Sequence, residues 1–127
     1  MLRGYFDDKA HPVISVRLMG PNGVIEVILA MDTGFSDDIC LPISAVVALG
    51  LPLRGAELVE MFDGSIKKGF VFKAECQMGD LPLRNVNVYI TESEDGLIGA
   101  GMFQNMKLEI DYGRQTVSLV PSQRGIE

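Results

Sequence analysis

In Val27-Ile28-Leu29-Ala30-Met31-Asp32-Thr33-Gly34-Phe35-Ser36, an apolar run leads straight into an aspartate, a hydroxyl residue and a glycine. A strand over this run would deliver the Asp32 carboxylate to the edge of the core, where partial burial makes its ionisation tunable. Gly34 permits a sharp turn with the backbone close to that carboxylate, and the hydroxyls of Thr33 and Ser36 stand near enough to orient it. The stretch therefore predicts a partly desolvated aspartate at the end of a strand, with an ionisation that its surroundings can tune. The alternative is a turn aspartate that bonds only its own backbone.

Alternating apolar and polar residues on both sides of this stretch predict short β-strands. Ile14, Val16 and Leu18 alternate with polar residues, and a turn at Pro21-Asn22-Gly23 precedes the next strand, residues 24–31. That strand is nearly all apolar, so a central place in a sheet is expected for it. The same period of two recurs at residues 72–78, 86–90, 108–110 and 117–119. The predicted fold class is mostly β.

Two short helices are expected to interrupt the strands. Ser44 fits the N-cap of a helix over residues 45–49, with Gly50 just past its end and Pro52 blocking continuation. Residues 101–106 fit one or two further helical turns. No linker or second composition regime divides the 127 residues, so residues 1–127 are expected to form one domain.

Charge and hydropathy exclude several kinds of partner. The chain has 11 Lys and Arg against 17 Asp and Glu, a formal net charge of −6. An acidic chain without a basic stripe argues against nucleic-acid binding, and its apolar runs are too short to span a bilayer. Residues 1–11 mix charges of both signs and lack the apolar centre of a signal peptide. A cytoplasmic protein without nucleic-acid or membrane partners is therefore expected.

The small numbers of histidines and cysteines exclude several further kinds of catalytic and metal-binding site. His11 is the one histidine, so neither a histidine-rich metal site nor a Cys/His zinc site of usual spacing is available within the chain. A histidine-assisted nucleophile would have to use His11 itself. Cys40 and Cys76 do not make a disulfide framework and are expected to be reduced core residues. No metal and no organic cofactor is predicted.

Two segments carry a resemblance to a known family. Asp32-Thr33-Gly34-Phe35-Ser36 resembles the active-site loop of aspartic proteases, in which Asp-Thr-Gly or Asp-Ser-Gly is followed by Ser or Ala. Asp95-Gly96-Leu97-Ile98-Gly99 resembles the second element of the retropepsin-like (retroviral-type) branch, where two apolar residues before a glycine pack against the first loop and a short helix follows. The bacterial single-domain members of this branch commonly have similar residues after the catalytic loop, here Leu41-Pro42 and Leu49-Gly50-Leu51-Pro52. The resemblance covers about residues 13–120 and implies a closed acid-protease-type β-barrel, one lobe per chain.

A hairpin is predicted between the two segments, over residues 58–72. Asp63-Gly64 between apolar flanks is a strong signal for a two-residue turn. By its place in the order of elements, the hairpin resembles the flap that covers substrate in aspartic proteases, with Phe62, Asp63, Gly64 and Ser65 at the cleft. The alternative is an ordinary solvent-exposed hairpin.

The resemblance implies peptide hydrolysis by two carboxylates that share one proton across a water. One carboxylate acts as general base on the water while its protonated partner polarises the scissile carbonyl. The chain has a single Asp-Thr-Gly, and Leu97-Ile98-Gly99 carries no aspartate in the equivalent place. A homodimer is therefore predicted, with Asp32 of each chain meeting on a two-fold axis and an extended peptide or protein as substrate.

The resemblance implies further roles around the loop. Thr33 of each chain would reach across to the other chain's loop, the Ser36 hydroxyl would bond the catalytic carboxylate, and strands near both termini could form a shared sheet. Asp37-Asp38 departs from the family pattern, since small or neutral residues are usual there. These two carboxylates either raise the local pKa or point to solvent. The competing function is a non-catalytic dimeric peptide-binding or interaction module that retains the fold.

Overall fold

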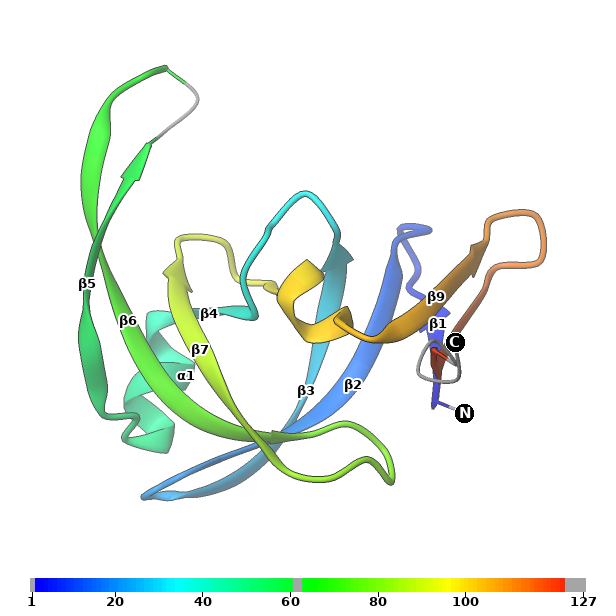
Figure 1. The fold of residues 1–127 in the computed structure, drawn as a ribbon, viewed down its shortest axis with the longest axis horizontal. Helices are drawn as coiled ribbons and strands as arrows, with labels where there is room; N and C mark the ends of the chain where they lie inside the picture. The colour runs from blue at the N-terminus through cyan, green and yellow to red at the C-terminus, as the bar shows by residue number, and fades with distance from the viewer. Residues whose placement is uncertain (1, 61–62, 123–127) are drawn as a thin grey trace.

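The computed structural model of the protein describes residues 2–60 and 63–122, and these residues are mostly β (Figure 1). The mostly-β fold class is therefore confirmed. In this described part of the chain no helix is long and apolar enough to cross a membrane. The elements are, in chain order, β1 (Leu2–Phe6), β2 (Pro12–Gly20), β3 (Gly23–Asp32), β4 (Ile39–Pro42), α1 (Ile43–Leu49), β5 (Leu53–Glu60), β6 (Ile66–Gln77), β7 (Arg84–Thr91), β8 (Gly96–Gly99), the 3₁₀ turn η1 (Ala100–Phe103), β9 (Met106–Asp111) and β10 (Thr116–Pro121).

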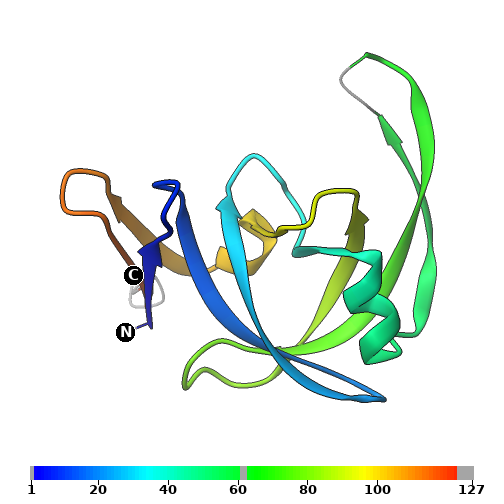
Figure 2. The ribbon, with the colours of Figure 1, turned by 180° about the vertical axis from the view of Figure 1, so that it is seen from behind.

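The strands form one sheet that partly returns on itself. Its order is β5-β6-β7-β4-β8-β3-β2-β1-β10-β9, and an additional pairing of β6 with β2 joins the run from β6 to β2 into a ring. The β5–β6 hairpin projects from one end of the molecule, while β1, β9 and β10 lie at the opposite end (Figures 1 and 2). This pairing pattern does not by itself establish a closed barrel, so the expected closed barrel stays a prediction.

Strand alternation fills the inside of the ring as the sequence predicts. Ile14, Val16 and Leu18 are at most 2% exposed, whereas the intervening Ser15 and Arg17 are exposed. The main core cluster adds buried side chains from β3, β4, α1, β6, β7, β8, η1 and β10. Successive strand residues face opposite sides of a sheet, so the period of two in the sequence becomes an inner and an outer face.

Strand β3 lies between β2 and β8, as its apolar sequence predicts. Its inward face is only partly covered, however, because Ile25, Val27 and Met31 are half-buried, and its outward face is more open. Leu29 is fully buried, but Val24 and Ile28 are 57% and 54% exposed. The expectation drawn from composition is correct for the strand's place in the sheet, while the outward face keeps apolar side chains in solvent.

The two helices differ in their bounds from the prediction. The helix α1 begins at Ile43 with Pro42 in the N-cap position, so Ser44 lies inside the helix rather than capping it. The chain passes directly from β4 into α1 through the extended Pro42, which leaves no separate cap residue. Gly50 ends α1 as predicted, with a left-handed φ of 64°. The second helix is only the turn η1, because Asn105 adopts a φ of 64° and β9 begins at Met106.

The β5–β6 hairpin is present, but its turn is longer than predicted. Glu60 pairs with Ile66, and among the described residues no pair lies nearer to Asp63-Gly64, so these two residues do not directly join paired strands as a two-residue turn would. The Asp63 carboxylate accepts hydrogen bonds from the hydroxyl and the backbone N–H of Ser65, at 2.6 and 2.9 Å. These two bonds lower the pKa of Asp63 and hold a local side-chain turn, which explains the extra length. The predicted cleft residue Phe62 lies outside the described residues.

Candidate active site

Asp32 is the last residue of β3 and is partly buried. Its Oδ1 accepts a hydrogen bond from the backbone N–H of Gly34 at 3.0 Å, and its carbonyl accepts one from the N–H of Phe35 at 3.1 Å. The chain therefore turns back at once after the carboxylate, as the Asp-Thr-Gly sequence predicts. Thr33, Gly34 and Ser36 are exposed on this loop. Their predicted roles toward a partner loop and the carboxylate stay predictions.

The structure brings the second sequence element directly beside Asp32. Strand β8 runs parallel to β3, with Met31 opposite Ile98 and Asp32 opposite Gly99. Ile98 is fully buried and Leu97 is half-buried. Two segments that are far apart in the sequence, and that resemble the two active-site elements of the family, thus pair side by side in the sheet.

Three backbone hydrogen bonds fasten the Asp32 loop to this second element. Each joins an N–H of residues 99–101 to a carbonyl of the loop: Gly99 to Asp38 at 2.8 Å, Ala100 to Phe35 at 2.8 Å, and Gly101 to Asp37 at 3.0 Å. The approach is close enough to require glycine at position 99. A Cβ added there would lie 2.3 Å from the Asp37 carbonyl oxygen and 2.4 Å from Cδ2 of Phe35.

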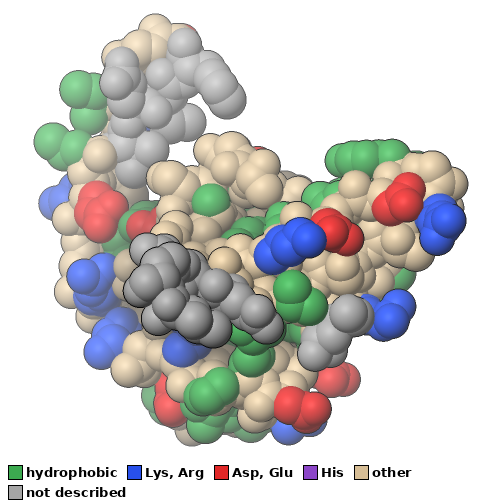
Figure 3. Space-filling view, turned by 45° about the vertical axis from the view of Figure 1, so that its right-hand side comes forward, with side chains coloured by type: hydrophobic (Ala, Val, Ile, Leu, Met, Phe, Trp, Pro, Cys, Tyr) green, Lys and Arg blue, Asp and Glu red, His purple; other side chains and the backbone are tan. Residues whose placement is uncertain are grey.

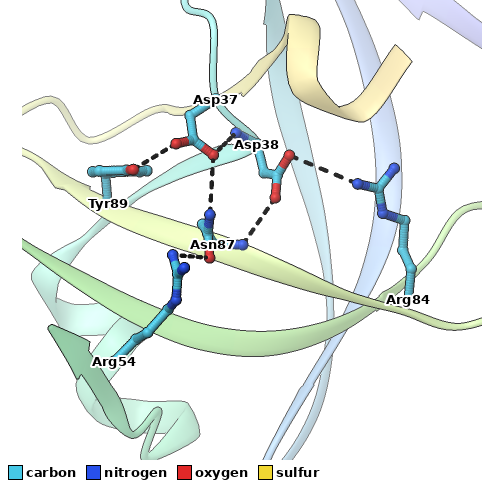
Figure 4. A network of polar contacts seen from close by, with 6 residues as sticks. All are labelled: Asp37, Asp38, Arg54, Arg84, Asn87 and Tyr89. Carbon is cyan, nitrogen blue, oxygen red and sulfur yellow. Dashed lines mark hydrogen bonds and ion pairs between the residues drawn. The ribbon is translucent and has the colours of Figure 1, made fainter. Parts of the chain in front are cut away.

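Asp37 and Asp38 anchor the loop on β7 (Figure 4). Asp38 is buried, and its Oδ2 accepts a hydrogen bond from the backbone N–H of Asn87 at 3.0 Å, while Arg84 lies 3.8 Å from its other oxygen. Asp37 accepts a hydrogen bond from Tyr89 through Oδ2 at 2.5 Å and one from the Asn87 side chain through Oδ1 at 3.4 Å. Of the two alternatives left open for these carboxylates, the one in which they point to solvent is wrong, because β7 supplies hydrogen-bond donors for both.

We expect Asp38→Ala to lower the free energy of unfolding by about 2 kcal/mol, because a partly buried N–H of Asn87 loses its acceptor. Asp38→Asn keeps an acceptor oxygen and should lose less. Urea unfolding measures both variants, with Glu92→Ala in the exposed loop before β8 as the control. A loss for Asp38→Ala no larger than that of the control would contradict this role.

The hairpin and the Asp32 loop project on the same side of the sheet (Figures 1 and 2). Asp63, Gly64 and Ser65 are exposed at the hairpin tip. In the space-filling view the hairpin rises clear of the body of the molecule, and basic and acidic side chains are interspersed over the visible face (Figure 3). The predicted role of the hairpin as a flap over substrate stays a prediction.

Cys40 and Cys76 are free thiols, half-buried on β4 and buried on β6. Burial raises the pKa of both thiols to about 11, and at Cys40 the charges of Asp32 and Asp37 contribute to this rise. Both thiols are thus protonated at neutral pH and poorly nucleophilic. Among the described residues, no three His, Cys, Asp or Glu side chains are grouped to hold a metal.

Sequence reasoning missed the side chains of Asn87, Tyr89, Arg54 and Glu57. Asn87 and Tyr89 alternate with buried valines and so read as an ordinary solvent-facing side of a strand. In the structure both lie against Asp37, and each also contacts β5. Arg54 donates a hydrogen bond to the Asn87 side chain at 2.9 Å, and the Tyr89 hydroxyl donates one to Glu57 at 3.1 Å. No local pattern distinguishes a polar strand face in solvent from one that faces a distant loop.

Comparison with known proteins agrees with this geometry. No curated protein sequence matches the chain. Among solved structures, the chain is similar to a retropepsin-like aspartic protease from Rickettsia conorii, with 18% identity and a TM-score of 0.64 over 93% of this chain and 88% of that one. This likeness shows the retropepsin-like fold. A family model described as "Aspartyl protease" matches residues 14–102, which include both the Asp32 loop and the Leu97-Ile98-Gly99 element. The chain therefore belongs to the aspartyl protease family and is an aspartic-type peptidase.

Proposed function

We propose that the protein is an aspartic endopeptidase that works as a homodimer, with Asp32 of each chain activating one shared water. The observation that carries the proposal is the register of β3 with β8, in which Asp32 lies opposite Gly99. The family's chemistry needs two carboxylates face to face. The second element of this chain, which lies beside Asp32, has a glycine there instead.

The two carboxylates nearest to Asp32 in the sequence, Asp37 and Asp38, are already held by contacts with other side chains. Asp38 is buried against Asn87 and Arg84. Asp37 accepts hydrogen bonds from Asn87 and Tyr89. Neither side chain is therefore available as a partner for Asp32, which supports a second chain as the source of the second carboxylate.

The paired aspartates need no metal or organic cofactor in this mechanism. One ionised Asp32 removes a proton from the water, and the protonated Asp32 of the other chain donates a hydrogen bond to the scissile carbonyl. The two carboxyl groups titrate as a unit because adjacent negative charges repel. The peptide binds extended, with its main chain paired to the β5–β6 hairpin and to strand edges.

The shared sheet that strands near both termini were expected to form in the dimer needs a different strand edge. Strand β10 already pairs with β1 on one side and β9 on the other within the chain. In the described residues β9 has a partner on one edge only, so we expect a shared sheet to form along its other edge. Thr33 of each chain would link the two active-site loops. In this proposal the β6-to-β2 ring is the closed barrel of one lobe, and residues 1–127 act as a single domain.

The two free thiols favour a reducing compartment. This observation supports the cytoplasm as the location of the protein. Peptides or proteins of that compartment would then be its substrates.

A subunit-mixing experiment tests the shared site. Asp32→Asn chains are co-refolded in equal amount with wild-type chains, and cleavage of a peptide library is measured at mildly acidic pH with and without an aspartic-protease transition-state analogue. Random pairing leaves half of the wild-type chains in mixed dimers, so activity per wild-type chain should fall to about half.

Co-refolding wild-type chains with an equal amount of an Asp95→Asn chain is the control. Because Asp95→Asn chains are expected to be active, activity per total chain should stay unchanged and activity per wild-type chain should double. An activity that stays constant per wild-type chain as Asp32→Asn is added would show that one chain holds a complete site. Such a result overturns the shared-site mechanism.

A further inference from the structure

Tyr89 on β7 contacts both the Asp32 loop and the β5–β6 hairpin. Its ring packs edge-on against Phe35 of the loop, with the ring centroids 5.8 Å apart at an interplanar angle of 87°. Its hydroxyl donates a hydrogen bond to Oδ2 of Asp37 at 2.5 Å and a longer one to Oε2 of Glu57 on β5 at 3.1 Å. One half-buried side chain of β7 therefore joins the loop to the hairpin.

Each of the two loop residues in contact with this tyrosine is also bonded to the second active-site element. The carbonyl of Phe35 accepts a hydrogen bond from the N–H of Ala100 at 2.8 Å, and the carbonyl of Asp37 accepts one from Gly101 at 3.0 Å. The N–H of Phe35 in turn donates to the carbonyl of Asp32 at 3.1 Å. The tyrosine thus acts on the part of the loop that is bonded both to η1 and to Asp32 itself.

The tyrosine hydroxyl is the donor for one carboxylate oxygen of Asp37, and other groups hold the second oxygen. Oδ1 of Asp37 accepts hydrogen bonds from the N–H of Asp38 at 2.8 Å and from the Asn87 side chain at 3.4 Å. Burial raises the pKa of Tyr89, and its hydrogen bonds to Asp37 and Glu57 raise it further, so the hydroxyl remains a donor in acid and at neutral pH. Removing this hydroxyl therefore loosens the loop without detaching it.

We propose that Tyr89 is a positioning residue for Asp32, which fixes the loop against η1 and ties the β5–β6 hairpin to the same anchor. Two catalytic carboxyl groups must meet across one water, so a small displacement of the loop lowers the rate of the chemical step. This effect on cleavage rests on the proposed function. The effect on the loop and the hairpin does not, because it follows from contacts within one chain.

Tyr89→Phe tests the positioning role in peptide cleavage. The variant keeps the ring against Phe35 and removes only the hydroxyl. We expect kcat to fall by about tenfold while KM changes by less than about twofold, because the chemical step is affected more than peptide binding. Tyr112→Phe makes the same chemical change at a tyrosine that is 67% exposed in the turn after β9, and it should keep both constants.

A double-mutant cycle separates this role from a general loss of packing. Asp37→Ala removes the acceptor on the loop, so adding Tyr89→Phe to it should lower kcat by less than about twofold. In Asp37→Asn the amide can donate a hydrogen bond to the tyrosine oxygen. The contact is then kept, and most of the activity should be retained.

Hydrogen exchange tests the same contact without a peptide substrate. The N–H groups of Ala100 and Gly101 donate to loop carbonyls. In Tyr89→Phe they should exchange up to about tenfold faster relative to amides of β9 and β10, the equilibrium equivalent of one net hydrogen bond. Paired amides of β5 should also exchange faster. Glu57→Ala removes only the hairpin contact, so it should speed exchange in β5 and leave Ala100 and Gly101 as in the wild type.

Exchange rates of Ala100 and Gly101 in Tyr89→Phe that equal those in Tyr112→Phe would overturn the proposal. Faster exchange with an unchanged kcat would overturn the positioning role as well. A loss of cleavage that lies wholly in KM, or effects that fully multiply in the double-mutant cycle, would do the same. If the wild type cleaves no peptide, the proposed function fails, and the exchange rates still decide whether Tyr89 joins the loop to the hairpin.

Discussion

Replacing Asp32 by Asn is expected to lower peptide cleavage by about 10³-fold, the scale on which acid–base groups contribute to catalysis. The amide has nearly the shape of the carboxyl group, and its oxygen still accepts the hydrogen bond that Gly34 donates at 3.0 Å. It neither takes a proton from the water nor shares one with the opposing chain. Initial rates of peptide cleavage across the acid range measure the loss.

The matched control for this variant is Asp95→Asn. It makes the same chemical change at an exposed residue just before β8 and should retain wild-type cleavage. Unfolding curves of the three proteins should superimpose, which separates a chemical effect from a folding effect. Retained cleavage in Asp32→Asn would remove Asp32 from the chemistry. A wild-type protein that binds peptides but leaves them intact throughout the acid range would favour the non-catalytic binding module.

Gly99→Ala is expected to lower the free energy of unfolding by about 3 kcal/mol, toward the upper end of the cost of overpacking. The new methyl group would lie 2.3 and 2.6 Å from the carbonyl oxygens of Asp37 and Phe35. These are backbone atoms, and both carbonyls also accept the hydrogen bonds that fasten the loop. The loop cannot retreat from the methyl group without lengthening those bonds. Urea unfolding measures the change.

Gly55→Ala is the control for this substitution. A Cβ at Gly55 would have no neighbouring atom within 4 Å, so the same change should shift stability by less than about 0.5 kcal/mol. If Gly99→Ala were as mild as the control, the close packing between β8 and the Asp32 loop would not be a source of stability. Any surviving activity of Gly99→Ala would then show how far the loop geometry tolerates displacement.

The strands were predictable where the signal was local. Ile14, Val16 and Leu18 alternate with polar residues, and the structure buries these three and exposes the residues between them. The failures also have local causes. Ser44 suits an N-cap by residue type, but Pro42 already joins β4 to α1 without a gap. Asp63-Gly64 suits a two-residue turn, but the side chain of Asp63 accepts a hydrogen bond from the backbone N–H of Ser65, and the strand pairing ends at Glu60 and Ile66.

The Asp32 loop and the Leu97-Ile98-Gly99 element could be found from the sequence, because short motifs and the period of two are properties of neighbouring residues. The β3–β8 register and the close approach at Gly99 arise only when the folded chain brings those segments together. The same holds for Asp37 and Asp38, whose partners Asn87 and Tyr89 are about 50 residues away. The sequence does not show in which direction a carboxylate side chain points. The donors that orient it belong to another strand, and only tertiary structure decides which strand lies there.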